Sequence, residues 1–138
     1  MSQNHDFDWV MERSKCSVAI EFFELRELAD KNATLRSRQV SSTNIGFQVL
    51  VTPGNNNQFV VRRFGENSDA QIAFNLNSDH ILIVDPVNNR EFKVTVGLND
   101  DGECRFRVNG EGEFQLWHVL KKALDGLFFD VVAKAETR

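Results

Sequence analysis

The sheet of this protein is decided by residues 80–108, which read HILIVDPVNNREFKVTVGLNDDGECRFRV. Within 90–98 the apolar side chains fall on alternate positions: Phe92, Val94, Val96 and Leu98. Such alternation is typical of a β-strand with one face on the core. The turn residues Asp101-Gly102 separate this stretch from a second alternating one at 103–108. Strands joined by so short a turn run antiparallel, so the pair predicts a hairpin.

The same pattern extends toward the N-terminus. It predicts further strands at residues 46–52, 58–64, 70–76 and 80–85. The last of these contains four consecutive apolar residues, Ile81 to Val84, which is typical of a central strand or of one covered on both faces. Short connections leave no room for crossover helices. We therefore expect an antiparallel meander of five to six strands, which excludes a Rossmann or α/β-barrel fold.

A long N-terminal helix is predicted over residues 8–31, where neither Pro nor Gly interrupts good helix formers. Its apolar residues form two stripes on nearly opposite sides. One stripe contains Met11, Val18, Phe22, Leu25 and Ala29, and the other contains Trp9, Cys16, Ile20 and Phe23. Each apolar stripe needs a surface to pack against, so two stripes on opposite sides need two packing partners. We expect the sheet on one side and either the C-terminal helix or another subunit on the other.

A long C-terminal helix packed on the sheet is predicted over residues 113–133, with one broad apolar stripe. Gly126 interrupts it, yet the helical period continues beyond. The alternative is a helix that stops at Gly126 and a short strand at 127–132. Phe129 falls on the polar side and is a candidate partner contact. The polar residues 32–45 are expected to form a connection, with an edge strand near Val40 or a mobile loop as alternatives.

The fold class is therefore α+β, in a single domain spanning 1–138 with flexible ends at 1–7 and 134–138. The net charge of −4 gives no general attraction for nucleic acid or anionic membranes. No stretch is apolar enough for a membrane span, and the first residues do not resemble a secretory signal. Cys16 and Cys104 lie far apart in no motif. They are expected to be buried, reduced thiols in a cytoplasmic protein.

Motifs for catalysis or metal binding do not stand out. His5, His80 and His118 lack the spacing of metal ligands, so no metal or cofactor is expected. Cys16 could meet His118 only if the two helices pack together, and a thiol on an apolar stripe is usually inert. Residues 110–112, Gly-Glu-Gly, precede the C-terminal helix, but the flanking carboxylates disfavour an anion. An enzymatic role is uncertain and less expected than a binding role.

The leading hypothesis is a non-enzymatic protein-interaction or adaptor module. It would form a homodimer, or bind another protein, through Ile20, Phe23 and Phe129. The alternative is a small apolar-ligand-binding protein with a Phe-lined cavity between sheet and helix, since the chain has 12 Phe and no Tyr. A third hypothesis, less favoured than a solvated sheet face, is a nucleic-acid or anion surface formed by Lys93, Arg105 and Arg107.

Overall fold

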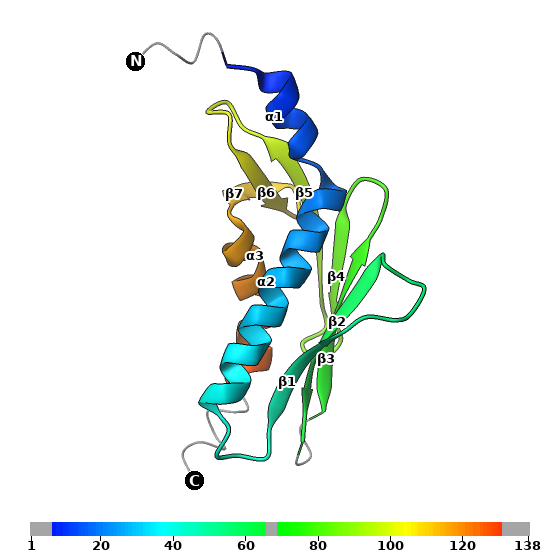
Figure 1. Cartoon of the computed structure of the whole chain (residues 1–138), viewed down its shortest axis with the longest axis vertical. Helices are drawn as coiled ribbons and strands as arrows, with labels where there is room; N and C mark the ends of the chain where they lie inside the picture. Colours follow the sequence, from blue (N-terminus) through cyan, green and yellow to red (C-terminus); the bar gives the residue numbers. More distant parts are fainter. Residues whose placement is uncertain (1–6, 66–68, 131–138) are drawn as a thin grey trace.

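A computed structural model describes residues 7–65 and 69–130. They form one antiparallel sheet with the long helices packed on one of its faces (Figure 1). The helical elements are α1 (Trp9–Lys15), α2 (Val18–Gln39), α3 (Leu116–Asp125) and the π-helical turn η2 (Gly126–Asp130). The strands are β1 (Gly46–Leu50), β2 (Gln58–Phe64), β3 (Ala70–Leu76), β4 (Ile81–Asp85), β5 (Arg90–Leu98), β6 (Cys104–Val108) and β7 (Glu111–Phe114).

The strands follow one another in chain order, β1 to β7, and every neighbouring pair is antiparallel. The predicted meander and the α+β fold class are confirmed. The described sheet has a seventh strand, β7, where the C-terminal helix was expected to begin. The chain reverses at Asn109 and Gly110, whose φ angles are 54° and 79°. These angles fit a two-residue hairpin turn. The strand that follows lies at the edge of the sheet and lacks apolar alternation, which is why the sequence pattern did not predict it.

The predicted N-terminal helix is broken in two. It ends at Lys15, and α2 starts after Ser17, whose hydroxyl accepts a hydrogen bond from the Ile20 amide at 3.1 Å. This is an N-cap contact, which begins a new helix. The helix α2 then continues to Gln39, through residues expected to be a connection. Val40 caps it and forms no strand.

The two cysteines form a disulfide, so the prediction of reduced thiols was wrong. Their Cα atoms are 5.5 Å apart although 88 positions separate them in sequence. The bond joins the break between α1 and α2 to β6. None of the residues of α1 is buried, so the disulfide holds this end of the chain against the sheet. Among the described helices, none has the length and apolar character to cross a membrane.

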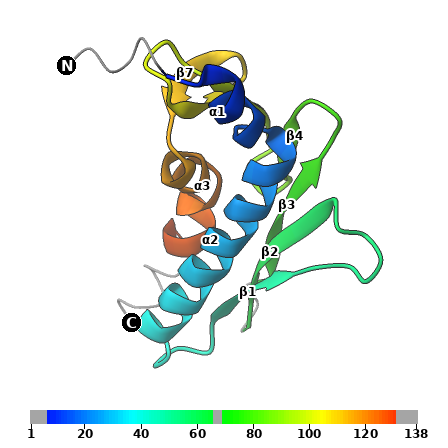
Figure 2. The same ribbon diagram turned by 45° about the horizontal axis from the view of Figure 1, so that its top comes forward.

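Figure 2 shows α2 lying over one face of the sheet. Buried phenylalanine side chains pack between the two. The ring centroids of Phe59 and Phe74 are 4.5 Å apart, and those of Phe22 and Phe59 are 5.2 Å apart. All three side chains are fully buried, as is Phe106. Aromatic contacts of this kind add to the free energy of burial. The core therefore lies between the helices and one sheet face.

Candidate functional site

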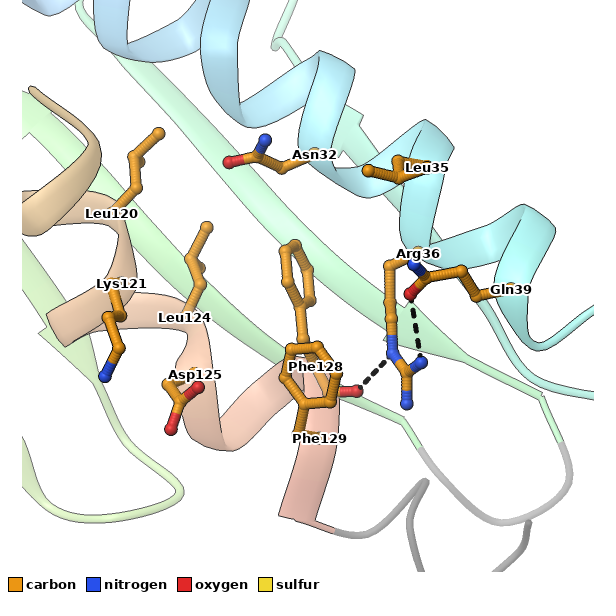
Figure 3. A pocket seen from close by; sticks show the side chains of 10 residues that line it. All are labelled: Asn32, Leu35, Arg36, Gln39, Leu120, Lys121, Leu124, Asp125, Phe128 and Phe129. Carbon is orange, nitrogen blue, oxygen red and sulfur yellow. Dashed lines mark hydrogen bonds between the residues drawn. The ribbon is translucent and has the colours of Figure 1, made fainter.

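The candidate site is a groove between the C-terminal half of α2 and the segment formed by α3 and η2 (Figure 3). Its volume is about 240 Å³. The residues that line it are Asn32, Leu35, Arg36, Gln39, Leu120, Lys121, Leu124, Asp125, Phe128 and Phe129. The groove is thus bounded by helices, whereas the sequence predicted a cavity between helix and sheet.

The turn η2 shapes one wall of the groove, and two buried arginines hold it in place. Arg36 on α2 donates from Nε to the carbonyl oxygen of Phe128 at 2.9 Å. Arg63 on β2 donates from Nη1 to the carbonyl oxygen of Leu127 at 3.0 Å. Carbonyls at the end of a helix lack intrahelical partners, and cations there also interact favourably with the helix dipole.

The structure also distinguishes the two alternatives predicted after Gly126, a continuing helix and a short strand. Residues 126–130 are helical, with Gly126 in helical geometry, so a strand beginning at Leu127 was the wrong alternative. The remainder of the predicted element, from 131 onward, lies outside the described residues.

The groove has an apolar floor with two exposed apolar side chains at its rim. Leu120, Leu124 and Phe128 are buried. In contrast, Leu35 is 54% exposed and Phe129 is 45% exposed. The Phe129 ring lies under the guanidinium of Arg36, with 4.1 Å between the guanidinium carbon and the ring centroid. Polar side chains, among them Asn32, Gln39 and Lys121, also line the groove. Apolar residues surrounded by polar ones are typical of protein contact sites.

The other two predicted contact residues lie at the far end of α2. Ile20 is 45% exposed, whereas Phe23 is half-buried and packs edge-on against Phe22 with centroids 5.5 Å apart. Sixteen positions separate Ile20 from Arg36, which is about 24 Å along a helix axis. Within one copy of the chain, therefore, Ile20 does not reach the groove that Phe129 lines.

The Glu21 carboxylate on the first turn of α2 has a perturbed pKa. Glu21 is half-buried, and burial raises its pKa from 4.5 to about 7, with further contributions from the charge of Glu24 and a hydrogen bond to it. A charged form that is both desolvated and next to a like charge is disfavoured. With a pKa of about 7, the Glu21 carboxylate is partly protonated near pH 7 and charged at higher pH.

A second buried carboxylate, Asp85, belongs to the end of β4. Its two oxygens accept hydrogen bonds from the backbone and side-chain amides of Asn88, and from Nε and Nη2 of Arg90. Burial alone would raise the pKa of Asp85, but these hydrogen bonds and the Arg90 charge outweigh it and lower the pKa. The arrangement closes the β4–β5 hairpin, which is a structural role.

The proposed basic surface lies on the sheet face opposite the helices. Lys93 and Arg107 are exposed there, and Arg105 pairs with Glu103 at 3.0 Å. Arg62 shares this face and lies 3.4 Å from Asp69. The Phe92 and Phe106 side chains of the same two strands face the helix side, so β5 and β6 present no stacking ring beside the cations.

Catalytic and metal chemistry finds little support among the described residues. They contain no group of three His, Cys, Asp or Glu side chains that could hold a metal ion. Cys16 is bonded to Cys104, so it offers no thiolate to His118. The His118 ring instead caps α3 by accepting from the Gln115 amide at 3.3 Å. Residues 110–112 form the turn and start of β7.

Among the residues that line the groove, the sequence predicted only Phe129 as a contact residue. Leu35 and its neighbours on α2 were missed because the helix was predicted to end before them. The signal was present, since Ala29, Ala33 and Arg36 continue the helical spacing of the buried stripe. No protein-family model, curated protein or solved structure matches the chain. The function is therefore inferred from the groove itself.

Proposed function

We propose that this protein is a protein-interaction module that self-associates, with the groove between α2 and η2 as the contact surface. The observation that carries the proposal is the pair of exposed side chains, Leu35 and Phe129, at the rim of an apolar groove. Large apolar side chains that gather around a concave apolar surface are typical of contact sites.

The magnitudes indicate a weak complex. Complete burial of a Leu or Phe side chain contributes about 1.5–3 kcal/mol, and these two are already half-buried. Four such side chains in a symmetric dimer would contribute roughly 3–6 kcal/mol. Association costs about 4–15 kcal/mol in lost freedom of motion. The rim residues therefore need additional contacts, and we expect a dimer that dissociates on dilution.

The test is sedimentation velocity over roughly 1–100 μM protein. We expect the sedimentation coefficient of the wild-type protein to rise with concentration. The Leu35→Ser and Phe129→Ser variants should stay monomeric with unchanged circular dichroism. Val10→Ser is the matched control, because Val10 is 59% exposed, close to the 54% of Leu35, but lies in α1 and does not line the groove. A wild-type protein that is monomeric throughout overturns the proposal.

The cytoplasmic location predicted from the sequence is a separate question and needs its own test. Disulfides persist in oxidising compartments and are usually transient or regulatory in the cytoplasm. The Cys16–Cys104 bond therefore weighs against a cytoplasmic location. Alkylation of thiols at the moment of cell lysis, followed by mass spectrometry, decides the point. Alkylated Cys16 and Cys104 support the cytoplasm, and an intact bond contradicts it.

A second candidate function is the binding of a small apolar ligand in the same groove. Phe128 and Phe129 contribute two aromatic side chains, as a Phe-lined site requires. A volume of about 240 Å³ is slightly below the usual range of ligand pockets, so the ligand would be small. Native mass spectrometry of freshly purified protein tests this function. A monomer with added small-molecule mass, lost in Leu35→Ser, supports it; a bare monomer contradicts it.

A further inference from the structure

We infer that two copies of the chain associate with their α2 helices antiparallel, so that Ile20 of each copy packs beside Leu35 at the rim of the other copy's groove. The inference rests on the proposed self-association and specifies its geometry. It follows from the order of charges and apolar residues along the outer face of α2.

The outer face of α2 is free to receive a second copy. Figures 1 and 2 show that no described helix or strand covers the side of α2 that faces away from the sheet. The helix lies wholly within the described residues, and its exposed large apolar side chains are Ile20 and Leu35. One lies near each end, so a partner helix that buries both must run along nearly the whole length of α2.

The charges on this face change sign along the helix. Glu24 and Glu27 are exposed in the first half, and Lys31 and Arg38 are exposed in the second half. A parallel pair of helices would place like charges opposite each other. An antiparallel pair places the acidic half of one copy opposite the basic half of the other, which is the complementary arrangement.

The spacing of the residues also fixes the register. Ile20 and Leu35 are centred on the peptide bond between Glu27 and Leu28, and so are Glu24 and Lys31. A two-fold axis through that point therefore pairs Ile20 with Leu35 and Glu24 with Lys31 at once, on both sides of the axis. At 100° per residue the four side chains fall within an arc of about 60°, so they share one face.

In this register, Ile20 of one copy lies beside Leu35 at the rim of the other copy's groove. Leu35 lines the groove together with Arg36 and Phe129, so the second copy's Ile20 adds the apolar contact that the rim lacks within one chain. One feature opposes the pairing. Glu27 lies beside the two-fold axis, so the Glu27 side chains of the two copies are close together and repel each other. Removal of that charge should therefore strengthen the dimer.

Cysteine cross-linking tests the geometry directly. In one chain, positions 20 and 35 are about 22 Å apart along the helix, too far for a disulfide within the molecule. We expect the double variant Ile20→Cys with Leu35→Cys to form covalent dimers on mild oxidation, with peptide mapping showing a 20–35 bond. The two single variants are the controls. A 20–20 bond in Ile20→Cys indicates parallel helices and overturns the inference.

Charge exchange provides a second measurement that leaves the core untouched. Glu24→Lys and Lys31→Glu should each raise the dimer dissociation constant about 2- to 30-fold, as expected for two exposed ion pairs. The double charge exchange should restore it, and Glu27→Gln should lower it. Asp30→Lys is the control, since Asp30 is exposed but lies about 80° or more around the helix from Ile20, Glu24, Lys31 and Leu35.

The outcomes separate the inference from the proposed function. A dimer that forms no 20–35 bond and ignores the charge exchange overturns the antiparallel geometry but leaves self-association intact. A protein that is monomeric at every concentration overturns both.

Discussion

Arg36 donates a hydrogen bond from Nε to the carbonyl oxygen of Phe128 at 2.9 Å, although the two residues are 92 positions apart. This contact fastens the last turns of α2 to the turn η2. The same guanidinium covers the ring of Phe129. One side chain thus fixes the wall of the groove and orients the exposed aromatic residue at its rim.

Replacement of Arg36 by Met should destabilise the protein by about 1.5–3 kcal/mol, because the Phe128 carbonyl loses a charged donor in a buried place. The matched control is Arg38→Met, which removes an exposed arginine two positions away and should change stability by less than about 0.5 kcal/mol. Urea unfolding followed by circular dichroism measures both. Tryptophan fluorescence is a poor probe of this unfolding, because Trp9 and Trp117 are already exposed in the folded protein. Equal stability of the two variants would contradict the anchoring role.

Removal of the disulfide should loosen α1 first. The double variant Cys16→Ser with Cys104→Ser should lose about 2–5 kcal/mol of stability, because the bond closes a long loop in the unfolded chain. Amide hydrogen exchange should accelerate in α1, which has no buried residue, more than in α2. Chemical reduction of the wild-type protein should reproduce the pattern. Unchanged protection of α1 after reduction would show that other contacts hold it.

Glu21 should make stability depend on pH near neutrality. Its pKa is about 7 in the folded protein and 4.5 in the reference state, so the folded state binds more protons between these values. The free energy of unfolding should therefore fall as pH rises from 4.5 to about 7. Glu21→Gln should be more stable than wild type above that range and show no advantage below it. Unfolding titrations across pH measure this, and Glu24→Gln should reduce the effect.

Asp85 should make stability depend on pH in the direction opposite to that of Glu21. Asp85→Asn should cost about 1–3 kcal/mol at neutral pH, since donors from Asn88 and Arg90 lose a buried carboxylate. Its pKa is lowered from 3.8, so the stability that it contributes is present above that pH and is lost as pH falls through the folded-state pKa. The gap between wild type and variant should thus close in acid. A constant gap would mean that the substitution acts through packing alone.

Much of the fold follows from local sequence patterns. Alternation in β5 and β6 and the turn at Asp101-Gly102 are sufficient to predict antiparallel neighbours, because strand pairing across a tight turn is a local matter. The exposure of Phe129 follows from its position on the helical wheel, and the structure agrees. The break at Ser17 could not be predicted from helix propensity, since it depends on a cap and on a bond to Cys104.

The sequence by itself determined the antiparallel order of the strands from β1 to β6 and the helical character of the segments on either side of them, since these depend on periodicity and turn chemistry within a few residues. Only the tertiary structure decided the Cys16–Cys104 bond and the groove beside Leu35. It also decided that Arg36 and Arg63 hold the two carbonyls of η2. Each of these joins residues tens of positions apart, and the free energy that selects them comes from packing elements together rather than from any local pattern.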